Sequence, residues 1–284
     1  MKTILLYGAR GYIGDHLLKV FDESKMQIVC PITRLENKDA VCADLARYEP
    51  DYVVSCTGRT HGRDAQGNVI GTIDYLENPD TLDENIKDNL FGPVQLALLC
   101  DQRNIHYTYI GTGCIYHSDY AQEPPTTFDE EMPPNFKGSA YSLVKGYTDR
   151  LLASTKALVL RIRLPLASKD HPRNTLSKLV SYPAIHSLPN SVTCFSMWKH
   201  LPYMMECRLT GVFNFVNKGS ITNDAILRLY REHVDPTHTW ELVETLHVAA
   251  ARSNTVLDTN KLERIIPELE TAQEAVKRCV QEWH

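Results

Sequence analysis

Tyr141 and Lys145 are the residues whose types and spacing point most directly to acid–base chemistry in this 284-residue chain. Because they are four positions apart, they would lie on one face of a helix predicted over residues 141–155. A nearby ammonium lowers the pKa of a phenol from about 10 and stabilises developing negative charge. A tyrosine in this setting can protonate a carbonyl oxygen during hydride transfer. The same pair also occurs on ordinary exposed helices, so its meaning depends on the rest of the chain.

A glycine-rich turn near the N-terminus gives the pair its context. The turn follows an apolar segment at residues 3–6 and opens a helix, as a dinucleotide-binding fingerprint requires. We expect Gly8 to form a tight turn, Gly11 to let the backbone approach a pyrophosphate, and Gly14 to allow close helix–strand packing. The predicted cofactor-binding turn consists of Gly8, Arg10, Gly11, Tyr12, Ile13 and Gly14. The alternative is an ordinary strand–helix turn without a ligand.

The residues that would determine cofactor specificity favour NADPH. An Asp or Glu at the end of the second strand usually binds the ribose 2′-hydroxyl of NAD, and none follows the predicted strand at 27–30. Arg34, together with Arg10, would instead neutralise a 2′-phosphate. The alternative is that both arginines are solvated surface charges. Thr57 and Gly58 follow the next strand and are expected to meet the cofactor's far phosphate or ribose.

Two further polar residues follow the predicted strand at 106–110, at the carboxyl end where open α/β sheets place their ligands. Thr112 is a natural hydrogen-bond partner for the same carbonyl oxygen. Cys114 would face the substrate, and a thiol that ionises near pH 8.5 can remove a proton next to a ketone. Its alternative is a small buried apolar residue. Asn89 would support a water relay near Lys145, or is a simple polar helix residue.

Short apolar segments alternate with longer amphipathic ones, which predicts a mainly parallel sheet covered on both faces by helices. The predicted strands are residues 3–6, 27–30, 52–55, 106–110, 157–162 and 212–215. The predicted helices are residues 14–21, 82–100 and 141–155. The sequence therefore predicts an α/β chain with a Rossmann-type doubly wound parallel sheet.

This alternation breaks near residue 168, where a segment with four prolines begins. The chain from about residue 234 is loop-rich and then helical. We therefore predict an NADP-binding Rossmann domain over residues 1–167, completed by a late strand and helix near 210–233. A smaller, discontinuous C-terminal substrate-binding lobe is predicted over residues 168–209 and 234–284.

Charge and cysteine content narrow the range of functions. The net charge is −5, and the 23% of charged residues are mixed along the chain, which gives little support to a nucleic-acid or membrane-surface role. The apolar start is too short for a signal peptide or a membrane span. The eight cysteines contain no C-x-x-C pair, so neither a zinc or other metal site nor a disulfide framework is indicated. They are typical of reduced thiols in a cytoplasmic protein.

With these residues described, the chain resembles the extended short-chain dehydrogenases that act on nucleotide sugars. More closely, it resembles the bifunctional 3,5-epimerase/4-reductases of UDP-L-rhamnose synthesis in plants and a giant virus. The resemblance covers nearly the whole chain and is strongest at residues 8–14, 33–36, 111–115, 135–141, 172–174, 188–191 and 252–254. The loop at residues 59–74 matches only loosely, which leaves substrate detail there uncertain.

The resemblance implies a substrate, UDP-4-keto-6-deoxyglucose, and roles for several residues. Cys114 and Lys178 would be the acid/base pair that epimerises C3 and C5. By pattern alone, Lys178 would be a solvated helix lysine. Tyr141, Lys145 and Thr112 would then assist hydride delivery from NADPH to C4. Substrate-binding roles are implied for Asn174, Arg252 and Asn254.

The resemblance also implies partners. The chain has no N-terminal 4,6-dehydratase domain like that of the fused plant enzymes, so the keto-sugar would come from a separate dehydratase. The helix of Tyr141 often mediates a homodimer in this superfamily, although a monomer is also compatible with the sequence. Two other functions stay open: a reductase that acts only on 4-keto-rhamnose, and a non-catalytic NADP-binding regulatory subunit.

Overall fold

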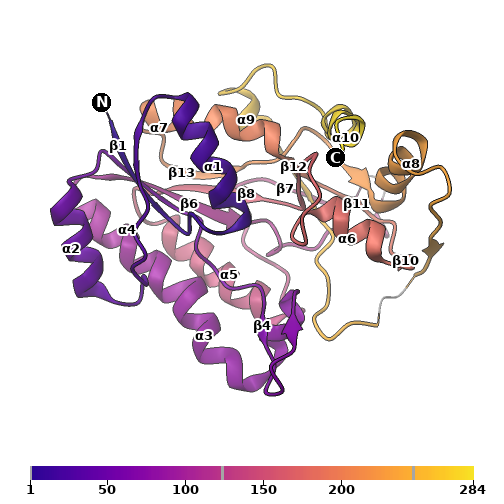
Figure 1. Ribbon diagram of the computed structural model, residues 1–284, viewed down its shortest axis with the longest axis horizontal. Coiled ribbons are helices and arrows are strands. Elements are labelled where there is room, and N and C mark those ends of the chain that lie inside the picture. Colours follow the sequence, from indigo (N-terminus) through magenta and orange to yellow (C-terminus); the bar gives the residue numbers. More distant parts are fainter. Residues whose placement is uncertain (1, 123–124, 245–246) are drawn as a thin grey trace. The chain divides into compact units, whose positions relative to one another are not determined.

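Six short apolar segments form the central sheet, as the alternation of the sequence predicts (Figure 1). The computed structural model describes residues 2–122, 125–244 and 247–284, which include every predicted site residue. The strands are β1 (Thr3–Tyr7), β2 (Gln27–Val29), β3 (Tyr52–Ser55), β6 (His106–Thr112), β8 (Leu158–Ile162) and β13 (Gly211–Asn214). Five of the six predicted strands agree with these bounds to within one residue at each end, and the sixth, predicted over residues 106–110, ends two residues before β6 does.

The strand order β13-β8-β6-β3-β1-β2 is that of a doubly wound fold. The chain moves outward from β1 to β2, and then from β3 in the opposite direction. β1 pairs in parallel with both β2 and β3, and β3 pairs in parallel with β6. Ile4 lies opposite Tyr52, which in turn lies opposite His106. The reversal of direction between β1 and β3 creates the switch point at which such sheets bind ligands.

Helices cover both faces of this sheet (Figure 1). One face carries α2 (Lys38–Tyr48), α4 (Gly92–Gln102) and α5 (Ala140–Leu152), and the other carries α1 (Tyr12–Glu23) and α7 (Leu201–Glu206). Apolar side chains of α2, α4 and α5 pack with the inward residues of the strands in one buried cluster. Leu5, Val53 and Val159 lie at its centre and are fully buried. The α/β doubly wound fold is thus confirmed.

The helix predicted over residues 82–100 is not a single α-helix. It consists of α3 (Leu82–Ile86), a π-helical turn η3 (Lys87–Phe91) and α4. Thr148 on α5 donates its hydroxyl hydrogen to the Asn89 carbonyl at 2.6 Å, so a neighbouring helix satisfies a backbone group of the π turn. Turns of this type are frequent at functional sites because they redirect side chains within a helix.

The chain divides into two compact units. The first comprises Met1–Thr112, Lys137–Leu160 and Trp198–Phe213, and the second comprises Gly113–Phe136, Arg161–Met197 and Asn214–His284. These bounds differ from the predicted ones. Residues 113–136 and 161–167 and the late helix α8 (Asn223–His233) belong to the second unit, and residues 198–209 belong to the first. Helix α8 belongs to the second unit because its buried residues Ile226 and Leu227 pack in the apolar core of that unit.

The second unit has short strands and its own apolar cores. Its remaining helices are α6 (Thr175–Ser181), α9 (Asn260–Glu263) and α10 (Ala272–Gln281). Its strands are β7 (Thr127–Phe128), β9 (Pro165–Leu166), β10 (Ala184–Ile185), β11 (Pro189–Asn190), β12 (Thr193–Cys194), β14 (Ile221–Thr222), β15 (Glu241–Leu242) and β16 (Val256–Leu257). The hairpin strands β4 (Gly62–Arg63) and β5 (Val69–Ile70) belong to the first unit. Within the described residues, every helix is too short or too polar to cross a membrane.

Candidate active site

The glycine turn lies at the switch point of the sheet, between the ends of β1 and β3. Gly8 has a φ of +82°, and a Cβ there would lie 2.9 Å from the Cys56 carbonyl carbon. A Cβ on Gly14 would lie 2.2 Å from the Gly8 carbonyl oxygen. Only glycine fits at either place, because the backbone passes so close, and the turn is therefore as tight as a dinucleotide-binding fingerprint requires. Helix α1 begins at this turn without a side-chain cap, which suits an anion at its N-terminus.

Arg10 and Arg34, which were predicted to bind the 2′-phosphate of NADPH, are both exposed. Arg34 has 69% of its side chain exposed, and its guanidinium lies 3.8 Å from the Asp88 carboxylate. Asp88 has a closer partner in Arg59, whose Nε lies 2.7 Å from it. Asp88 therefore holds Arg34 only weakly, and the Arg34 guanidinium remains accessible to a phosphate.

Asn89 is fully buried and holds the loop that follows β3. Its Oδ1 accepts a hydrogen bond from the Arg59 N–H at 3.1 Å, and its Nδ2 donates to the Arg59 carbonyl at 2.9 Å. A Cβ on Gly58 would lie 2.9 Å from Asn89 Oδ1 and 3.8 Å from Lys145 Nζ. The structure therefore brings the predicted residues Gly58, Asn89 and Lys145 together. Thr57 lies beside them, with its hydroxyl 2.8 Å from the Ser55 hydroxyl.

Tyr141 and Lys145 are both buried on α5, where the Lys145 Nζ lies 5.9 Å from the centre of the Tyr141 ring. The Lys145 ammonium also donates a hydrogen bond to the Tyr109 hydroxyl on β6. Burial raises the pKa of Tyr109 well above its ordinary value, so this phenol stays neutral. Thr112 ends the same strand and is 7% exposed. The residues predicted to assist reduction thus come from α5 and β6 of the first unit.

Cys114, in the second unit, contacts an arginine that the sequence analysis did not single out. Arg163 Nη1 donates a hydrogen bond to the Cys114 sulfur at 2.7 Å. Its Nη2 donates to Asn190 Oδ1 at 2.5 Å and to the Ser253 carbonyl at 2.9 Å. Asn190 Nδ2 in turn donates to Asn254 Oδ1 at 3.0 Å. Cys114 is therefore not an apolar core residue but part of a polar network.

Lys178 lies on α6 in a cationic part of the second unit. Burial lowers the pKa of its ammonium, and the positive charges of Arg173 and Arg252 lower it further. Arg252 is held by a hydrogen bond of 2.8 Å from its Nη1 to the Ala250 carbonyl. These surroundings favour the neutral amine, which is the form that can remove a proton. They do not resemble those of a solvated surface lysine.

The geometry does not support the expected substrate contact of Asn174. This residue is fully buried at the start of α6, where its Oδ1 accepts from the Leu176 N–H at 3.1 Å. Its Nδ2 donates to the Ala167 and Lys169 carbonyls at 2.7 and 2.8 Å. Since backbone groups use both ends of the amide, Asn174 caps the helix that carries Lys178.

Comparison with known proteins identifies the family of the chain. Residues 4–164 match the model of the NAD dependent epimerase/dehydratase family. The chain belongs to this family. The chain is 33% identical to a bifunctional dTDP-4-dehydrorhamnose 3,5-epimerase/dTDP-4-dehydrorhamnose reductase of Arabidopsis thaliana. The match covers 98% of this chain and 92% of the plant protein.

A crystal structure of a UDP-rhamnose synthase from Acanthamoeba polyphaga mimivirus is also similar to this family member. It has 38% sequence identity and a TM-score of 0.93, and 99% of each chain is covered. A trifunctional UDP-glucose 4,6-dehydratase/3,5-epimerase/4-keto-reductase of Arabidopsis is 32% identical over 96% of this chain but only 40% of the plant protein.

Sequence reasoning missed Tyr109 and Arg163, and it quoted Arg173 only within a motif. Arg163 had one usable signal, because it directly follows a segment of apolar strand residues where a charge is unusual. Tyr109 had none, since a tyrosine within a buried strand resembles any core aromatic residue.

Proposed function

We propose that this protein epimerises UDP-4-keto-6-deoxy-D-glucose at C3 and C5 and then reduces the C4 ketone with NADPH to give UDP-L-rhamnose. The observation that carries the proposal is the presence of two acid/base sets in one chain. Tyr141, Lys145 and Thr112 form the reducing set, and Cys114 and Lys178 form the epimerising set. The relatives named as rhamnose synthases and epimerase/reductases support the same pair of activities.

The epimerising step follows from the C4 ketone. The ketone makes the C–H bonds at C3 and C5 acidic, because the electron pair left behind moves onto the ketone oxygen. One basic group, the neutral amine of Lys178 or the thiolate of Cys114, would take the proton as the C–H bond breaks. Return of a proton to the opposite face by the other group would invert the carbon. The lowered pKa of Lys178 supports its part in this exchange.

The reducing step requires a proton at the C4 oxygen while NADPH supplies the hydride. Tyr141 would donate this proton, and Thr112 would donate a hydrogen bond to the same oxygen. Lys145 would stabilise the tyrosinate that remains. Arg10 and Arg34 would hold the 2′-phosphate of the cofactor, and the turn at residues 8–14 its pyrophosphate. We assign cofactor binding to the first unit, and the contacts of Arg252 and Asn254 with the substrate to the second.

The keto-sugar would be supplied by a separate 4,6-dehydratase in the cytoplasm. The chain matches 40% of a plant protein whose name includes a 4,6-dehydratase activity beside the epimerase and reductase activities. A reducing compartment suits the eight cysteines, which contain no C-x-x-C pair.

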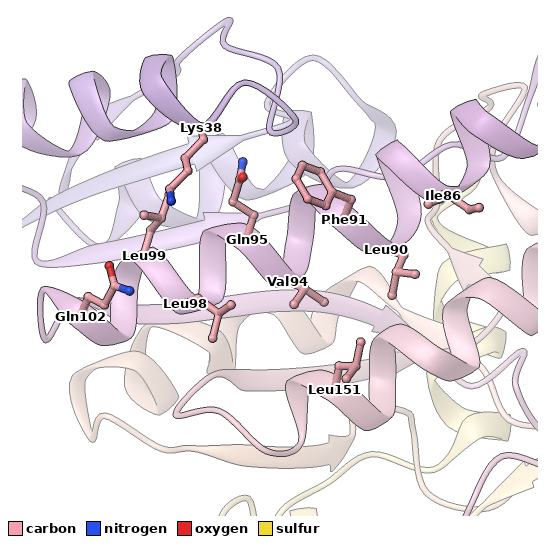
Figure 2. Close-up of a pocket in the computed structure, with 10 residues that line it drawn as sticks. All are labelled: Lys38, Ile86, Leu90, Phe91, Val94, Gln95, Leu98, Leu99, Gln102 and Leu151. Carbon is pink, nitrogen blue, oxygen red and sulfur yellow. The ribbon is translucent and has the colours of Figure 1, made fainter.

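We also propose a homodimer through the apolar face of α4 and α5. Figure 2 shows a shallow pocket of about 420 Å³ on this face, lined mainly by apolar side chains of η3, α4 and α5. Phe91, Leu98 and Leu151 are each about half exposed there. A contiguous apolar surface of this kind suits a second copy of the chain better than water. Light scattering of wild type and Leu98→Glu tests it: the variant should be a monomer, and a monomeric wild type would reject the dimer.

Incubation with UDP-4-keto-6-deoxyglucose in deuterated water, with and without NADPH, tests the proposed reactions by NMR. Deuterium should enter C3 and C5 without cofactor, and UDP-L-rhamnose should appear when NADPH is added. NADPH consumption without exchange would reduce the function to that of a 4-keto-rhamnose reductase. Absence of both reactions would favour a regulatory NADP-binding subunit.

A further inference from the structure

Arg163 is a buried arginine held in a fixed position in the second unit. It directly follows β8 and is 2% exposed. Its backbone N–H donates to the Thr193 hydroxyl at 3.0 Å, and its carbonyl accepts from the Thr193 N–H at 2.7 Å. Gly113 makes room for its aliphatic stem, because a Cβ at position 113 would lie 3.0 Å from Arg163 Cγ and Cδ. Backbone and stem therefore aim the guanidinium in one direction.

The guanidinium has no carboxylate partner. Its three hydrogen bonds go to the Asn190 amide oxygen, the Ser253 carbonyl and the Cys114 sulfur. Its Nε is buried without a hydrogen-bond partner among the described residues. Within the same residues, no Asp or Glu forms an ion pair with it. Arg163 is thus a buried cation whose charge is not neutralised by a carboxylate.

A buried charge without a counter-charge is costly, and arginine does not escape this cost by losing its proton. Of the three acceptors of Arg163, the amide and the carbonyl are neutral, and only the thiol of Cys114 can become an anion. A hydrogen bond from a guanidinium to an anionic sulfur is also stronger than one to a neutral thiol. The charge of Arg163 therefore favours the thiolate.

The other titratable groups near Arg163 do not supply a negative counter-charge. His117 comes from the loop after β6, and its pKa is lowered by burial and by the charges of Arg163 and His186, while Asp119 acts in the opposite direction. Burial raises the pKa of Tyr120, and Arg163 opposes that change. His117 and Tyr120 are consequently neutral near pH 7, and neither provides a counter-charge.

We propose that Arg163 is the fixed counter-charge of Cys114, which holds the sulfur in place and stabilises the thiolate form in which it acts as a base. Its catalytic consequence rests on the proposed epimerase function, whereas the charge pair is a property of the folded chain. When the thiolate takes a proton from C3 or C5, an S–H bond forms, a C–H bond breaks, and the electron pair moves to the ketone oxygen. Arg163 acts through Cys114 and is a positioning residue.

The pH dependence of thiol alkylation tests this pair without substrate. The intact enzyme is treated with iodoacetamide over a range of pH, and modification of each cysteine is followed by peptide mass spectrometry. The exposed Cys207 serves as the internal reference. In Arg163→Met, alkylation of Cys114 at pH 7 should fall about tenfold, as expected for a shift of one pH unit in its midpoint. Arg163→Lys should retain most of the wild-type rate.

Arg161→Met is the matched control, because Arg161 is a buried arginine within β8 and its guanidinium lies over the Tyr116 ring. It should leave the Cys114 profile unchanged. Should Arg163→Met fail to fold, Arg163→Gln replaces it in the comparison with Arg163→Lys. If alkylation of Cys114 depends on pH in the same way in wild type and in the variants without the Arg163 charge, the proposal is overturned. A shifted profile in an enzyme that exchanges no deuterium would sustain the counter-ion and reject the epimerase function.

Discussion

The Lys145 ammonium donates a hydrogen bond to the Tyr109 hydroxyl and lies 4.7 Å from the centre of the Tyr109 ring. Both side chains are buried, so this contact holds the position of a charged group inside the first unit. Tyr109→Phe removes the acceptor. We expect the free energy of unfolding in urea to fall by about 1.5–3 kcal/mol, the usual contribution of a hydrogen bond to a charged group. Reduction should slow while deuterium exchange persists, and an unchanged stability would contradict the structural role of the bond.

Tyr141→Phe should separate the two proposed reactions. Removing the phenolic hydroxyl abolishes the proton donor, and reduction of pre-epimerised 4-keto-rhamnose should fall at least about a hundredfold. Exchange at C3 and C5 should continue, because Cys114 and Lys178 are intact. Tyr147→Phe is the control, since Tyr147 is on the same helix but 59% exposed. Equal loss of both reactions in Tyr141→Phe would show that Tyr141 is not specific to reduction.

The surroundings of Lys178 predict a pH dependence of exchange. The neutral amine is present above the pKa of Lys178 and is lost as the pH falls through it. Arg173 lowers this pKa, so Arg173→Met should raise it and move the limb of the exchange profile that rises with pH to higher pH. The profile should be measured at saturating substrate, because Arg173 also suits phosphate binding. An unmoved limb would show that Lys178 is not the base.

The exposed Arg264 offers a matched control in the same unit. Arg264→Met removes an equal charge without altering the surroundings of Lys178. We expect its exchange profile to coincide with that of wild type.

Arg34 should determine the preference for NADPH. Arg34→Ala should raise the KM for NADPH about tenfold or more and leave the KM for NADH nearly unchanged, because only NADPH carries a 2′-phosphate. Lys19→Ala is a suitable control, since Lys19 is exposed on α1 beyond the glycine turn. A parallel rise in both KM values would instead indicate damage to the turn.

The sequence predicted the central sheet well because its strands are short apolar segments that occur between amphipathic helices. The strand predicted over residues 52–55 has the same bounds as β3, and the strand predicted over residues 27–30 is one residue longer than β2. The π turn at residues 87–91 was not predicted, since it depends on the contact between Thr148 and the Asn89 carbonyl rather than on local periodicity. The late helix α8 was predicted to complete the first unit, whereas its buried residues pack in the core of the second, with partners that are distant in sequence.

The candidate site was predictable where its chemistry lies within one motif. Gly8, Gly14, Tyr141 and Lys145 were predicted in this way. The electrostatic surroundings of Lys178 and the contacts of Arg163 join segments far apart in the chain, and spacing does not reveal them.

The space at Gly113 links two positions that are distant in the sequence. A side chain there would press on the stem of Arg163 and on Leu257, whose Cδ1 would lie 2.6 Å from the added Cβ. The glycine before Cys114 and the arginine after β8 therefore form a two-part signature that can be searched for in other sequences. A chain with the cysteine but with a bulky residue before it, or without the arginine, should carry an ordinary thiol. The signature would thus separate chains able to epimerise from relatives that only reduce.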